Sequence, residues 1–285
     1  MEVLQASGTD RIRLGRISAL LALAALAWLV VTRRMAGMDA GPGTDPGTLG
    51  FYTLSWVLMM AAMMLPSIVP MVLALPSIHG RRRIRDSIGA TPPTGLFVAG
   101  YLVAWTAFGL VAYALFTWVR SLSIGELRWS QDGRYLAGAV LVAAAIYQLT
   151  PAKNASLRRC RGAHDFVLGH RREGRLGALW MGALHGAWCV GCCWMLMAAL
   201  FALGLMSITW MVVIAGAIAA EKLLPSPPRT SRAIAVGLAV LGIALIGSPG
   251  RVPGLVLPGS GQAQRAMGAM GGGNGMHGTM TTSGR

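Results

Sequence analysis

Seven apolar runs alternate with polar segments along the chain. They cover residues 17–31, 51–75, 94–119, 135–150, 177–203, 208–224 and 232–247. Because about 20 apolar residues cross the hydrocarbon core of a bilayer as a helix, these runs predict transmembrane helices. The first run is short, but Thr32 and a snorkelling Arg33 extend it. We therefore expect an all-α fold, a polytopic membrane bundle of about seven transmembrane helices.

Composition agrees with lipid as the solvent. Only 12% of the residues are charged and 54% are hydrophobic, whereas a soluble domain carries about 25% charged residues. The net charge of +15 does not indicate a nucleic-acid partner, because the arginines form short clusters between the apolar runs. Four cysteines, three of them in one apolar run, are not the framework of a disulfide-rich secreted protein.

The chain divides into four parts. Residues 1–50 hold the first span and an outer loop, residues 51–224 form a core, and residues 225–250 hold the last span. The Gly- and Met-rich tail, residues 251–285, lacks periodicity, and we expect it to be disordered. Loop charge follows the positive-inside rule when the amino terminus is cytoplasmic and the tail lies outside.

The fifth run contains the densest group of chemically active side chains. His185, Cys189 and either Cys192 or Cys193 stand at i, i+4 and i+7 or i+8, so one helix face presents an imidazole and two thiols. Soft thiolate, thioether and imidazole ligands suit Cu(I) or zinc. The alternative is that these cysteines only pack as small apolar residues. Since ionisable groups at membrane depth are by default functional, we favour a metal site.

A cluster of methionines lies in the second run. Met59 with Met63, and Met60 with Met64, form i, i+4 pairs ahead of Pro66, which should kink the helix. Methionine often only fills gaps in a core, so packing and metal ligation both remain open. Counted at 1.5 Å per residue, the methionines and the cysteines reach similar depths, where they can share one site.

Other polar residues have simpler interpretations. We expect Glu221 to pair with an arginine or with Lys153, and Lys222 to snorkel to the interface. Cys160 and His164 are spaced for a weak secondary site. Outside the membrane, thioethers and imidazole that suit Cu(I) recur in the first loop and the tail, at Met35, Met38, Met267, Met270, Met276, His277 and Met280.

Two motifs carry a resemblance to a known family. The pattern M-M-x-A-M-M-x-P-S covers residues 59–67, and H-G-x-x-C-x-G-C-C-W covers residues 185–194 without a gap. In these residues the chain resembles the DUF2182 family, bacterial integral membrane proteins with predicted metal binding, over roughly residues 50–224. The family usually shows K-x-x-C-L-x-x-C after the fourth span, whereas here Lys153 is followed by Ser156, Leu157 and Cys160. The resemblance implies a bacterial inner membrane and a bound metal ion.

Three functions remain open at this stage. We favour Cu(I) capture, holding or transfer through His185, Cys189, Cys192, Cys193 and the four methionines, with zinc as the other metal and a periplasmic or membrane copper-handling protein as partner. The second is a thiol–disulfide oxidoreductase that uses the C-x-x-C pair Cys189 and Cys192. The third is a structural partner whose cysteines only pack. No G-x-x-x-x-G-K-[ST] motif is present, so we do not expect an ATPase.

Overall fold

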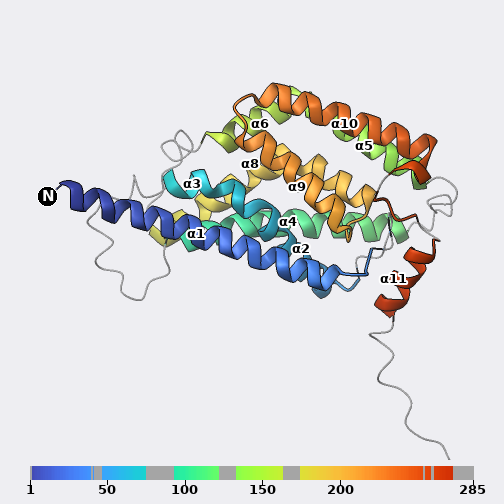
Figure 1. The fold of residues 1–285 in the computed structure, drawn as a ribbon, viewed down its shortest axis with the longest axis horizontal. Helices are drawn as coiled ribbons and strands as arrows, with labels where there is room; N and C mark the ends of the chain where they lie inside the picture. Colours follow the sequence, from blue (N-terminus) through green and yellow to red (C-terminus); the bar gives the residue numbers. More distant parts are fainter. Residues whose placement is uncertain are drawn as a thin grey trace, which may run out of the picture.

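The structure is a computed structural model, and it describes residues 2–39, 41, 47–74, 93–121, 133–162, 174–252, 254–257 and 260–271. In these residues it is helical, without strands (Figure 1). The elements in chain order are α1 (Glu2–Met35), α2 (Leu49–Met64), η1 (Leu65–Ile68), α3 (Val69–Ala74), α4 (Pro93–Ser121), α5 (Arg134–Gln148), α6 (Pro151–Arg161), α8 (Gly174–Leu203), α9 (Ile208–Leu223), α10 (Pro227–Gly247), η5 (Pro249–Arg251) and α11 (Gly261–Gly271). The predicted all-α helical bundle is confirmed.

Five segments of the described chain are long and apolar enough to cross a membrane. They are Leu14–Met35, Leu49–Leu73, Thr94–Val119, Gly174–Leu203 and Pro227–Gly247. Helices α5 and α6 make a sixth only if they count as one span, because they are bent by 66° at the break between them. Helix α9, expected to be a span of its own, has 16 residues. Seven spans therefore stay a prediction.

The α-helix of the second span ends at the predicted proline. Helix α2 ends at Met64, and the 3-10 helix η1 follows with Pro66 in its first turn, where the missing N–H is not needed. Ser67 Oγ donates to Met64 O at 2.7 Å, which satisfies a carbonyl that the break leaves open. The same hydroxyl accepts from Lys222 Nζ, a contact described below.

Helices α4 and α8 pack at unusually short range. At Gly182 an added Cβ would lie 2.0 Å from Phe97 O, and at Gly100 one would lie 2.0 Å from Leu179 O. Small residues let membrane helices approach in this way and gain dispersion energy that lipid does not supply. Helices α5 and α10 use the same device, with Gly138 against Gly242 (Figure 1). The first contact matters for function because α8 carries the cysteines.

The tail contains an element that we did not expect. Residues 261–271 form helix α11, which begins after Ser260, whose Oγ accepts from Ala263 N at 3.2 Å. Alanine, glutamine, arginine and methionine are good helix formers, and their local preference prevails over the glycines around them. Residues 272–285 lie outside the described residues.

Candidate metal centre

One helix carries the predicted histidine and its three cysteines. His185, Cys189, Cys192 and Cys193 all lie on α8, and each is at most 3% exposed. The side chains therefore share one buried stretch of helix, as the spacing indicated.

The structure adds a thiol from a different helix. Cys160 lies on α6, and its Sγ, Cys189 Sγ and Cys192 Sγ all lie within 4.8 Å of one another. A metal–thiolate bond is about 2.3 Å long in zinc sites, so three sulfurs around one ion lie about 4 Å apart. The group therefore fits a thiophilic ion with small adjustments. The sequence spacing predicts for Cys160 only a weak secondary site with His164, which lies outside the described residues.

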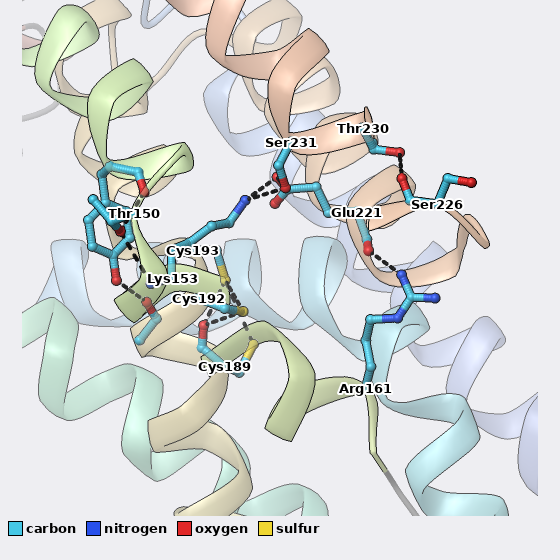
Figure 2. A network of polar contacts seen from close by, with 12 residues as sticks. Thr150, Lys153, Arg161, Cys189, Cys192, Cys193, Glu221, Ser226, Thr230 and Ser231 are labelled. Atoms are coloured by element: carbon cyan, nitrogen blue, oxygen red, sulfur yellow. Dashed lines mark hydrogen bonds and ion pairs between the residues drawn. The ribbon is translucent and has the colours of Figure 1, made fainter. Parts of the chain in front are cut away.

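Cys193 lies at the edge of this group. Its Sγ is 3.6 Å from Cys192 Sγ and 3.8 Å from Cys189 Sγ. Both Cys192 Sγ and Cys193 Sγ donate to Cys189 O, at 3.1 Å and 2.8 Å (Figure 2). These thiols hold their protons on the helix backbone, and a bound metal ion must displace those protons to gain the sulfurs.

Cys189 has polar contacts with two other helices, α4 and α9. Tyr101 OH from α4 lies 3.0 Å from Cys189 Sγ, and Lys222 Nζ from α9 lies 2.9 Å from it. Lys222 also donates to Ser67 Oγ at 3.0 Å. The expectation that Lys222 snorkels to the interface is wrong, because its ammonium points inward and the residue is buried. Its partners in the interior, Cys189 and Ser67, offset the desolvation of its charge.

The methionine motif reaches the cysteines through this lysine. Met59, Met60, Met63 and Met64 are all buried, and Ser67 follows the last of them by three residues. Because Lys222 contacts both Ser67 and Cys189, the two motifs meet at its ammonium. Metal ligation by the four thioethers stays a prediction.

His185 faces an aromatic wall on α4. Its ring centroid lies 5.9 Å from that of Phe97 and 6.0 Å from that of Tyr101. The described group with ligand atoms within 4.8 Å of one another consists of Cys160, Cys189 and Cys192, without His185. Ligation by His185 therefore also stays a prediction.

A buried ion pair flanks the thiols. Lys153 Nζ on α6 bonds to Glu221 Oε1 on α9, and it also donates to Ser231 Oγ on α10 at 3.0 Å (Figure 2). Ser231 Oγ donates to the same carboxylate oxygen at 2.9 Å. The predicted pairing of Glu221 with Lys153 is confirmed, and it joins three helices in the interior.

The position where the resemblance expects a further cysteine also faces α8. Ser156 stands there, and a Cβ added at Gly191 would lie 3.1 Å from its Oγ. The sequence signal for this inner face of α6 is the spacing of Lys153, Leu157 and Cys160 at i, i+4 and i+7. Lys153 and Leu157 are buried, and Cys160 follows on the same face.

The outer methionines divide between interior and surface. Met35 is buried, and Met38 packs against the core. Met267 on α11 is 51% exposed. Met276, His277 and Met280 lie outside the described residues, so copper capture by the tail stays a prediction.

Comparison with known proteins identifies a family. No curated protein and no solved structure matches the chain. A family model described as "PpoB2: Copper chaperone" matches residues 53–245, which include most of α2, the cysteines of α6 and α8, and the buried ion pair. That match covers more than half of the chain. The chain belongs to the PpoB2 copper chaperone family.

Proposed function

We propose that this protein is an integral membrane copper chaperone that holds Cu(I) between Cys160, Cys189 and Cys192 and passes it to a second copper-handling protein. The observation that carries this proposal is the convergence of three buried sulfurs from two helices within 4.8 Å, in a chain of a copper chaperone family. Copper is the cargo here, bound and released, and the thiols are the binding groups.

The donor set favours Cu(I) over zinc. All three atoms are sulfur, a ligand type that suits both Cu(I) and zinc, so the number of ligands decides between the two ions. Structural zinc sites take four ligands, one more than this group supplies.

The proposal includes a direction across the membrane. Five apolar helices of sufficient length support a position in the bacterial inner membrane. With the amino terminus in the cytoplasm, the Met-rich tail lies outside, where it can meet incoming copper. A reporter that is active only after export, fused after Arg285, should be active. Activity of a cytoplasmic reporter at that position would overturn the orientation.

Binding experiments test the site directly. Purified protein in lipid nanodiscs is loaded with Cu(I) without oxygen, and a chromophoric Cu(I) chelator competes for the ion. We expect the wild-type chain to retain copper, the Cys189→Ser/Cys192→Ser variant to lose the tight site, and zinc to bind more weakly. The control is Val240→Leu, an exposed position on α10 outside the cluster. Unchanged copper retention in the double serine variant would show that Cys189 and Cys192 only pack and do not bind copper.

The same variants address thiol–disulfide exchange as the other function. The four cysteines of the structure are free thiols, and three of them lie close enough to exchange. If copper holding is the function, thiol trapping in cells should find Cys189 and Cys192 reduced and shielded from alkylation while copper is present. A population that shifts between oxidised and reduced forms on quinone depletion, whatever the copper supply, would favour the oxidoreductase.

A further inference from the structure

The three-sulfur group depends on a helix that folds back. Helix α6 leaves α5 at an angle of 66°, after Leu149 and Thr150. Thr150 Oγ1 accepts from Lys153 N at 3.3 Å and Pro151 opens the new helix, so the sequence starts α6 in a new direction. Cys160 is near the far end of this helix. Its distance from Cys189 and Cys192 is therefore set by how α6 docks.

One buried ion pair ties α6 to α9 and α10. Lys153 is fully buried on the inner face of α6, and its ammonium bonds to Glu221 and Ser231 (Figure 2). Within the described chain, Leu157 is the other buried side chain of α6, so apolar packing alone contributes little to this contact. Removing one partner of a buried pair leaves an uncompensated charge, which is strongly destabilising. The pair therefore holds α6 at one position on α9 and α10.

A second cation fixes the other end of α6 to the same place. Arg161 Nη1 donates to Glu221 O at 2.7 Å and to Leu224 O at 2.8 Å, carbonyls at the carboxyl end of α9. Such carbonyls lack partners within their own helix, so the guanidinium completes their hydrogen bonding. Glu221 thus binds α6 at two points: its carboxylate pairs with Lys153, and its backbone carbonyl accepts from Arg161. Cys160 lies beside the second of these contacts.

We propose that Lys153 is a positioning residue for copper: its buried pair with Glu221 keeps Cys160 in the coordination sphere that Cys189 and Cys192 begin. This inference rests on the proposed function. When the pair is intact, the ion has three sulfurs; when it is removed, α6 shifts and the two sulfurs of α8 remain. Lys153 does not touch the metal ion, and it acts through the helix that it holds.

The test compares the number of sulfurs around the bound ion. X-ray absorption of Cu(I)-loaded protein gives this number, which a merely structural loss of stability would not change. The main variant is Lys153→Met/Glu221→Leu, which removes both charges together and leaves no buried charge unpaired. Cys160→Ser supplies the reference spectrum of a two-sulfur site. Arg158→Gln removes an exposed charge from the same helix and is the matched control.

We expect three sulfurs in the wild-type chain and in Arg158→Gln, and two in both Lys153→Met/Glu221→Leu and Cys160→Ser. Cu(I) affinity should fall about 10- to 100-fold in the double variant, the range typical of residues that orient metal ligands. Three sulfurs and wild-type affinity in the double variant would overturn the inference. Two sulfurs already in the wild-type chain would overturn it too; copper holding would stand, but Cys160 would leave the proposed ligand set. A wild-type chain without copper–sulfur ligation would overturn the proposed function instead.

A second measurement covers the case in which the double variant does not fold. Arg161→Gln removes the other anchor of α6 without breaking the ion pair, and it is compared with Arg158→Gln in chains whose only cysteine is Cys160. In metal-free protein, alkylation of Cys160 should be faster in Arg161→Gln, because α6 detaches more often. X-ray absorption is also measured on copper-loaded Arg161→Gln protein that keeps its other cysteines. Equal alkylation rates together with three sulfurs in that protein would show that the anchors do not position Cys160.

Discussion

The contact between α4 and α8 makes a sharp prediction for Gly182→Ala. The added Cβ would lie 2.0 Å from Phe97 O, 2.8 Å from Phe97 C and 3.0 Å from Phe97 Cα. All three atoms belong to the α4 backbone, so no side-chain rotation relieves the clash. Real Cβ contacts do not fall below 3.0 Å, and the helices must therefore separate by about 1 Å, the difference between 3.0 Å and 2.0 Å.

The energy follows from two opposing effects. Overpacking of this kind costs about 1–3 kcal/mol, and the gain in helix propensity from glycine to alanine returns up to about 1 kcal/mol. We expect a net loss of about 1–2 kcal/mol of unfolding free energy. The matched control is Gly237→Ala on α10, where an added Cβ meets nothing within 4 Å. Only the gain in helix propensity remains at Gly237, so this variant should be as stable as the wild-type chain or more stable.

Thermal unfolding in nanodiscs, followed by helicity, compares the two variants with the wild-type chain. The same shift should lengthen the contact between Tyr101 and Cys189, since Tyr101 lies one helical turn from Phe97. Alkylation of Cys189 in metal-free Gly182→Ala protein should therefore be faster than in Gly237→Ala. Equal melting temperatures for the two alanine variants would refute the close approach of α4 and α8.

Three further predictions concern copper. Lys222→Met removes the ammonium beside Cys189. Because thiolates and Cu(I) together carry negative charge, Cu(I) affinity should fall by at least about tenfold in chelator competition. Unchanged Cu(I) affinity would show that the lysine has no electrostatic role in binding. Thiols must ionise to bind, so affinity should rise with pH and loading should release protons, measured in weakly buffered solution; a flat profile would exclude thiolate ligation. Deleting residues 267–285 should slow loading but keep the tight site; loss of that site would show that the tail supplies a ligand.

The sequence predicts the scaffold because its signals are local. Apolar run length predicts helices, proline predicts the break after Met64, and the spacing of His185 and the cysteines predicts their shared helix. Each of these properties depends on residues within a few turns of one another. The structure confirms them for the same reason, since a helix fixes the relation between i, i+4 and i+7.

Local sequence signals do not predict the third thiol, Cys160, because its position near the other two depends on tertiary packing. Cys160 stands 29 residues before Cys189, on a basic helix that looks like a polar loop in the sequence. Its place depends on the 66° bend and on the partners of Lys153. The prediction for Lys222 is wrong for a related reason. A lysine at a helix end normally snorkels, but here the side chain turns inward, where Ser67 and Cys189 receive the ammonium.

The adjacent residues Glu221 and Lys222 explain how one short helix serves both halves of the site. Their side chains leave α9 in different directions, Glu221 toward Lys153 on α6 and Lys222 toward Cys189 on α8. Glu221 therefore holds α6, the helix that carries Cys160, and Lys222 places a cation beside Cys189. A change in the position of α9 must affect both contacts together.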